Sequence, residues 1–112
     1  LNNVAWLMVQ QGKPGAVEIA QRANQLRPGR AALLDTLAAA LAAENQLPAA
    51  IRTQKDALEL SPREHAYRLS LARLYIQAGE RRMALAELEK LERSGDRFAG
   101  ETEARRLLSE LR

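Results

Sequence analysis

Hydrophobic positions recur along the chain at the spacing of amphipathic helices, and short polar breaks separate seven such stretches. In the first stretch, residues at i, i+3, i+4 and i+7 share one helix face: Leu1, Val4, Ala5 and Met8. The pattern predicts helices over about residues 1–11, 14–27, 30–44, 48–60, 62–78, 81–93 and 99–111. Strands are not expected, because β-branched residues are few.

The apolar faces of the later helices are expected to form the core. They comprise Ala16, Val17, Ala20, Ala23, Leu26, Leu34, Leu37, Ala38, Leu41, Ala50, Ile51, Ala57, Leu58, Leu71, Ala72, Leu74, Tyr75, Ala84, Leu85, Leu88, Leu91, Ala104, Leu107, Leu108 and Leu111. Charged residues fill the other side of the last predicted helix. Such a helix can cover the apolar end of a helical stack while it faces water.

Glycine and proline mark the breaks between the predicted helices. Gly79 is expected to end the fifth helix, because glycine adopts the left-handed conformation at low cost. Upstream of that helix, residues 61–64 have the composition of a helix start. Ser61 would cap the helix, Pro62 would take the first helical position, and Glu64 would complete a capping box.

The helices also repeat in pairs. Ala16 recurs as Ala50 and again as Ala84, and Pro28 recurs as Pro62, a period of about 34 residues. A fixed period with small residues at matching points indicates stacked copies of one helix pair.

The spacing within each pair resembles the tetratricopeptide repeat (TPR). The second pair carries the fullest version: Leu34-x2-Leu37-Ala38-x2-Leu41, then Ala50, Ala57 and Pro62. There are departures, since the usual Trp is Leu1, Leu34 and Arg68 in the three pairs, and the usual Gly is Ala. The resemblance implies an all-α, TPR-type α-solenoid with three helix-turn-helix repeats and a C-terminal capping helix.

The repeats divide the chain into four parts of one solenoid domain. Residues 1–29, 30–62 and 63–95 form the repeats, and residues 96–112 form the capping helix. Because the chain starts with Leu1, in the middle of a repeat, we expect it to be a fragment of a longer chain. Its first helix would then present an open apolar edge, which favours a homodimer.

A narrower resemblance concerns three short runs. They read Leu1-Asn-Asn-Val-Ala-Trp-Leu, Leu33-Leu-Asp-Thr-Leu and Leu91-Glu-Arg-Ser-Gly-Asp-Arg-Phe. These runs look like the C-terminal part of bacterial TPR lipoproteins that accompany exosortase (PEP-CTERM) exopolysaccharide systems. That resemblance implies a periplasmic or outer-membrane-associated parent protein in exopolysaccharide assembly or export. Without it, a cytoplasmic location is expected.

Charge and composition narrow the classes of function. The chain has 17 basic and 14 acidic residues, mixed along every predicted helix, which is typical of solvated faces rather than a nucleic-acid interface. There is no cysteine, which excludes disulfides and thiolate metal sites. No apolar run approaches the roughly 20 residues that span a bilayer, so direct membrane insertion is not expected.

The sequence offers little for catalysis. His65, the only imidazole, is expected to be solvated in the first turn of the fifth helix. One histidine without cysteine cannot build a nucleophile triad or a histidine-rich zinc site. Glu87, Glu89 and Glu92 follow a charged helix face, and no glycine-rich phosphate loop is present. We therefore expect no enzyme activity, no metal and no cofactor.

A binding function has better support, because the first helices of stacked helix pairs line a concave surface. Beside each packing face runs a stripe of residues at i, i+1, i+4, i+7 and i+8. The stripes are Asn2, Asn3, Trp6, Val9 and Gln10; Asp35, Thr36, Ala39, Ala42 and Ala43; and Leu69, Ser70, Arg73, Ile76 and Gln77. Partner contacts are expected from Asn2, Asn3, Trp6, Gln10, Asp35, Thr36, Ala39, Ser70, Arg73 and Gln77.

Trp6 is the most informative member of these stripes, because Trp and Arg are common interface anchors. The sequence leaves open whether Trp6 contacts a partner or packs on a preceding repeat. It also leaves open whether Asp35 and Arg73 pair with a ligand or are solvated.

These patterns predict a non-catalytic scaffold that binds a peptide or a helix of a partner protein. One alternative is a purely structural solenoid segment, or a self-association module, with the ligand site upstream. A further alternative is RNA binding, which a steep salt dependence of affinity would reveal.

Overall fold

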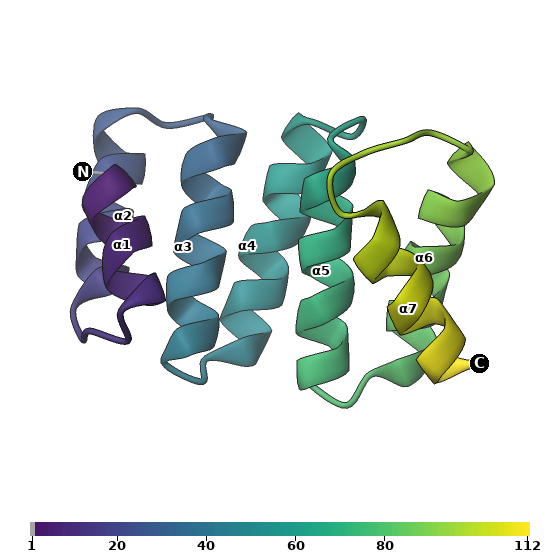
Figure 1. Cartoon of the computed structure of the whole chain (residues 1–112). Helices are drawn as coiled ribbons and strands as arrows, with labels where there is room; N and C mark the ends of the chain where they lie inside the picture. Colours follow the sequence, from purple (N-terminus) through teal and green to yellow (C-terminus); the bar gives the residue numbers. More distant parts are fainter. Residues whose placement is uncertain (1) are drawn as a thin grey trace. The chain divides into compact units, whose positions relative to one another are not determined.

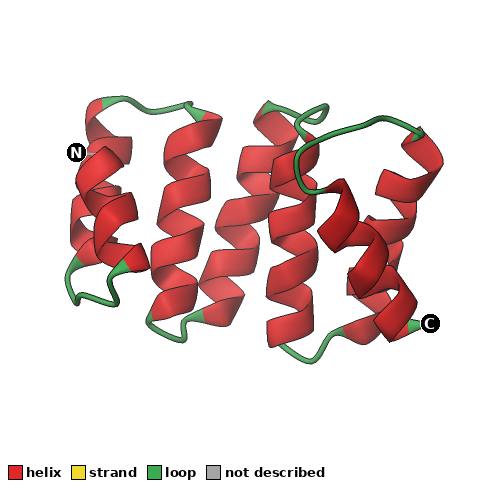
Figure 2. Ribbon diagram, in the orientation of Figure 1, coloured by secondary structure: helices red, strands yellow, loops and turns green. Residues whose placement is uncertain are grey.

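A computed structural model describes residues 2–112, apart from the side chain of Asn2. Leu1 and the Asn2 side chain, both part of the predicted patterns, lie outside the described residues. The described chain is all-α, as predicted, and contains no strand (Figures 1 and 2). Its helices are α1 (Asn2–Gln10), α2 (Ala16–Leu26), α3 (Ala31–Ala43), α4 (Leu47–Leu60), α5 (His65–Gln77), α6 (Arg81–Ser94) and α7 (Glu101–Leu111). None of these helices is long and apolar enough to cross a membrane.

The chain divides into two compact units, which we call the N-terminal unit (Leu1–Ser61) and the C-terminal unit (Pro62–Arg112). In the N-terminal unit, α1 packs against α2 and α3, α2 packs against α3, and α3 packs against α4 (Figure 1). In the C-terminal unit, α5 packs against α6, and α6 packs against α7.

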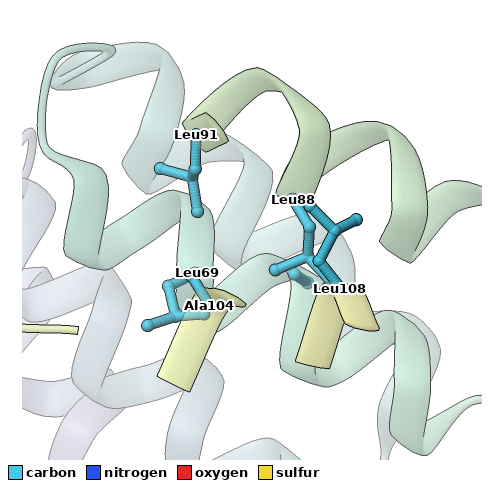
Figure 3. Close-up of a cluster of buried hydrophobic side chains, with 6 residues drawn as sticks. Leu69, Leu88, Leu91, Ala104 and Leu108 are labelled. Atoms are coloured by element: carbon cyan, nitrogen blue, oxygen red, sulfur yellow. The ribbon is translucent and has the colours of Figure 1, made fainter. Parts of the chain in front are cut away.

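Alanine and leucine have different roles in the two cores. Fully buried alanines let helix axes approach closely: Ala5, Ala38, Ala40, Ala50, Ala57, Ala72 and Ala84. Leucines from three helices fill the C-terminal unit, where Leu69, Leu88, Leu91 and Leu108 pack with Ala72 and Ala104 (Figure 3). Most residues predicted to face inward are buried, because the helical period alone determines which side chains share a face.

Two predicted core residues are exposed instead. Val4 is 49% exposed and Leu26 is 64% exposed. The neighbours of α1 are α2 and α3, and they leave about half of Val4 uncovered. Leu26 is the last residue of α2, where the chain leaves the helix. The period therefore marks an apolar face but cannot say how much of it a neighbouring helix covers.

The predicted start of the fifth helix is wrong. Ser61 ends α4, since its N–H still donates to the carbonyl oxygen of Ala57 at 3.1 Å. Glu64 is extended and precedes α5 at His65, and no side chain caps that helix start. The last turn of α4 and a short turn therefore use the residues that were expected to begin α5. The end of α5 is as predicted, with Gly79 at a φ of 78°.

Candidate functional site

Trp6 lies on an unusually apolar part of the surface. Its side chain is 51% exposed, and Leu7 on the same helix is also half exposed. No charged residue occurs anywhere in α1. Asn3 and Gln10 are exposed and stand three residues before and four after Trp6, so the three share one helix face. Interface centres have this composition, with an aromatic residue and few charges.

Helix α3 packs beside α1 and contributes small side chains. Ala39 is partly buried and Ala43 is exposed, one turn further along the helix. We define the α1/α3 face as the exposed or partly exposed stripe residues of these two helices: Asn3, Trp6, Val9, Gln10, Asp35, Ala39, Ala42 and Ala43. Of the predicted contact residues in the N-terminal unit, this face includes all but Asn2 and Thr36.

A pocket of about 220 Å³ opens where this face ends. It is lined by Val9, Gly12, Lys13, Pro14, Ala16, Ala40, Ala43 and Glu44. Val9 follows Trp6 by about one turn of α1, and Ala43 follows Ala39 by one turn of α3. The volume is below the roughly 300 to 1,000 Å³ of small-molecule sites and suits a single large side chain better.

Asp35 has an internal role that the sequence did not reveal. The amide Nε2 of Gln54 donates a hydrogen bond to Asp35 Oδ1 at 3.0 Å. Gln54 is fully buried in α4, so this bond helps to satisfy a polar side chain that lies in the core. Asp35 therefore ties α3 to α4 at the edge of the α1/α3 face.

Thr36 does not belong to the accessible surface. Its side chain is 4% exposed, and its Oγ1 donates to the carbonyl oxygen of Ala32 at 3.2 Å. A partner cannot reach it, because the hydroxyl points back along its own helix. Thr36 is therefore not one of the stripe residues that a partner could contact.

Two residues of the third predicted stripe, Leu69 and Arg73 on α5, contact α7. Arg73 donates from Nε to Glu103 Oε2 at 2.7 Å, and its Nη2 donates to the other carboxylate oxygen. The hydrogen bond from Arg73 is the main cause that lowers the pKa of Glu103 below its ordinary value. Leu69 is buried against α7, whereas Ser70 is partly buried and Gln77 is exposed. Arg73 thus forms an ion pair within the chain, while about half of its side chain stays exposed to solvent.

His65 is only partly solvated, since its side chain is 20% exposed and has partners within the chain. Its Nε2 lies 2.9 Å from Asp96 Oδ2, and its ring centroid is 5.3 Å from that of Phe98. The imidazole therefore links the start of α5 to the segment before α7. Within residues 2–112, no three His, Cys, Asp or Glu side chains gather as metal ligands would.

The sequence also failed to identify an internal ion pair. Arg68 Nη1 donates to Glu87 Oε1 at 2.7 Å, and Glu87 is buried in α6. Lys90 Nζ lies 3.4 Å from the other oxygen of Glu87. Glu87 had been assigned to a solvated helix face. The signal was Arg68, a charged residue three positions before the inward Leu71, where an apolar residue is usual.

No protein-family model and no curated protein matches the chain.

Proposed function

We propose that the chain is a non-catalytic scaffold whose α1/α3 face binds a segment of a partner protein, with Trp6 as the anchor. The observation that carries this proposal is the half-exposed Trp6 on an uncharged helix. Burying an aromatic side chain at the centre of an interface is among the largest single contributions to binding. The adjacent pocket offers a second anchoring point, lined partly by Val9 and Ala43.

The proposal includes the finer architecture, a TPR-type solenoid with three repeats and a capping helix. It is supported by the period of about 34 residues and by the pairing of α1 with α2, α3 with α4 and α5 with α6. The resemblance to exopolysaccharide-associated TPR lipoproteins suggests a cell-envelope assembly as the setting.

A matched set of variants tests the α1/α3 face. The full chain would be immobilised and exposed to soluble and envelope extracts of the source organism, beside the variants Trp6→Ala, Leu26→Ala and Arg73→Ala. Leu26 is an equally apolar, exposed side chain on α2, and Arg73 is a predicted contact residue that pairs internally. We expect a partner retained by the wild type and both controls. Its Kd should rise roughly thirtyfold in Trp6→Ala, the loss of about 2 kcal/mol.

Equal retention by the wild type and Trp6→Ala would contradict the proposal and favour a purely structural segment. Circular dichroism must show that Trp6→Ala remains helical. Because Trp6 is half exposed, its removal should cost little stability.

A second candidate for binding the exposed surface of α1 is another copy of the chain. Val4 and Leu7 stand three residues apart on α1, and both are half exposed. Their burial between two copies would give a homodimer. Sedimentation equilibrium would show it as a mass that rises with concentration in the wild type and not in a Val4→Ser, Leu7→Ser variant. A monomer at all concentrations would rule out this mode.

A further inference from the structure

The connection between α6 and α7, residues 95–100, is the longest one between the described helices. Arg97 lies in its middle and is exposed. Within residues 2–112, neither the N–H nor the carbonyl oxygen of Arg97 takes part in a backbone hydrogen bond. Free backbone groups of this kind can pair with a second chain through main-chain hydrogen bonds. The segment is therefore open to an enzyme that binds its substrate as an extended strand.

Five basic residues lie in the connections between the described helices, and four of them are poorly placed for cleavage. Proline follows Lys13 and Arg27, and its ring removes the N–H and restricts the residue before it. Arg30 and Arg63 are followed by no more than one residue before the next helix begins, so cleavage there requires that helix to unwind. Only the bond after Arg97 has three residues outside the helices on each side.

Two contacts hold this segment against the start of α5. His65 Nε2 lies 2.9 Å from Asp96 Oδ2, and the imidazole is tilted against the ring of Phe98 with the centroids 5.3 Å apart. Phe98 also packs against the buried cluster of the C-terminal unit. Because Asp96 and Phe98 stand on either side of Arg97, His65 restrains both neighbours of the exposed arginine. The bond can enter an extended cleft only when the segment lifts away from His65.

We infer that the Arg97–Phe98 bond is a processing site for a protease that prefers basic residues, and that His65 restrains its cleavage. This inference goes beyond the proposed binding function and does not depend on it. The protease takes the Arg97 guanidinium into an acidic pocket. Hydrolysis adds one water across the amide C–N bond, which leaves a carboxylate on Arg97 and an ammonium group on Phe98.

Cleavage separates α7 from the rest of the chain. The intact connection keeps α7 beside α6 at a high effective concentration, on the order of mM. After the cut, α7 is retained only by its packing in the buried cluster and by ion pairs such as Arg73–Glu103. The helix has 11 residues, and isolated helices shorter than about 12–15 residues are marginal in water. The peptide should therefore dissociate on dilution and leave the cluster exposed.

Brief digestion of the full chain with trypsin tests the site, and mass spectrometry identifies the products in their order of appearance. We expect fragments 1–97 and 98–112 to appear before any others. The Arg97→Gln variant should lose this first cut. The Arg63→Gln variant, which changes the arginine in the connection before α5, should keep the wild-type rate. Gel filtration of the cut protein at low concentration should separate the 98–112 peptide from the larger fragment.

A second variant tests the restraint. His65→Ala removes both contacts of the segment with α5, and it should speed the cut after Arg97 about fivefold. The rate follows the population of the opened segment when opening and closing are fast relative to cleavage. Cuts after Arg81 and Arg82, which are exposed but lie in α6, serve as the internal control. General destabilisation would speed these cuts as well.

Three results would overturn the inference. A first cut at another bond, or an unchanged rate in Arg97→Gln, would rule out the processing site. No acceleration in His65→Ala, or equal acceleration after Arg81, Arg82 and Arg97, would contradict the restraint by His65. A 98–112 peptide that stays with the larger fragment on dilution would show that cleavage does not separate α7.

Discussion

Arg68 and Glu87 illustrate how a single buried charge constrains a small helical unit. Their side chains are mostly buried, and the pair joins α5 to α6. A buried ion pair contributes little net stability, because the cost of removing two charges from water offsets their attraction. Removing one partner is costly, because the other charge then remains buried and poorly compensated.

A double-mutant cycle at this pair gives the first stability prediction. Arg68→Leu should destabilise the chain by roughly 3 kcal/mol, since the Glu87 carboxylate would keep only Lys90 as a partner. The double variant Arg68→Leu, Glu87→Leu should recover most of that loss, because an apolar pair suits the site. Urea unfolding measures both. A double variant no more stable than Arg68→Leu would show that packing, not charge, causes the loss.

At the scale of the element, α7 depends on close contact at its first turn. Gly100 has an ordinary φ of −92°, so its backbone does not require glycine. The requirement is spatial, because an added Cβ would collide with Leu69 Cδ2, and the buried Leu69 side chain could move away only by disturbing the core around it. The small size of Gly100 therefore allows α7 to pack closely against Leu69.

Gly100→Ala should destabilise the chain by about 1 to 3 kcal/mol through overpacking against Leu69. Gly100 is the N-cap of α7, a position where alanine is itself less favourable than glycine, so only a loss larger than about 1 kcal/mol indicates the collision. Thr102→Ala, at an exposed position of the same turn, serves as the control and should change stability by less than about 0.5 kcal/mol. Thermal unfolding followed by circular dichroism measures both. A Gly100→Ala variant more stable than the wild type would contradict the close contact.

At the scale of the whole molecule, acid sensitivity is expected from the C-terminal unit. Hydrogen bonds from Arg73 and Arg112 lower the pKa values of Glu103 and Glu92, respectively, below the ordinary value of 4.5. A lowered pKa in the folded state means that the charged form is favoured by folding. That stability is fully present above pH 4.5 and is lost as the pH falls through the lowered pKa values.

The unfolding temperature should therefore fall as the pH is lowered from 5 to about 3. The contribution of Glu103 to the free energy of unfolding should be below about 1 kcal/mol, because its ion pair with Arg73 is partly solvated. At pH 7, the Glu103→Gln variant should unfold at a slightly lower temperature than the wild type. Its unfolding temperature should also fall less than that of the wild type as the pH is lowered. Calorimetry at several pH values tests this. Parallel curves for the two proteins would show that the pair does not contribute.

Local pattern predicted the elements of this protein well. Helix periodicity and turn residues are properties of neighbouring positions, so the bounds of α2, α3, α4 and α6 were expected to within a few residues. The error at Ser61 arose because its turn could serve either the end of one helix or the start of the next. Trp6 was identified as a candidate from its place beside the packing face, and its exposure required the structure.

The sequence by itself determined the all-α class, the seven helices and most of their inward faces, because these follow from spacing within one helix. Only the tertiary structure decided which polar stripe residues are available to a partner. Asp35 meets Gln54 across 19 residues, and Arg73 meets Glu103 across 30. Such contacts depend on which helices pack together and on the side chains that happen to face each other there. The local sequence pattern does not contain this information. The candidate face is therefore limited to α1 and α3 by the way the helices pack.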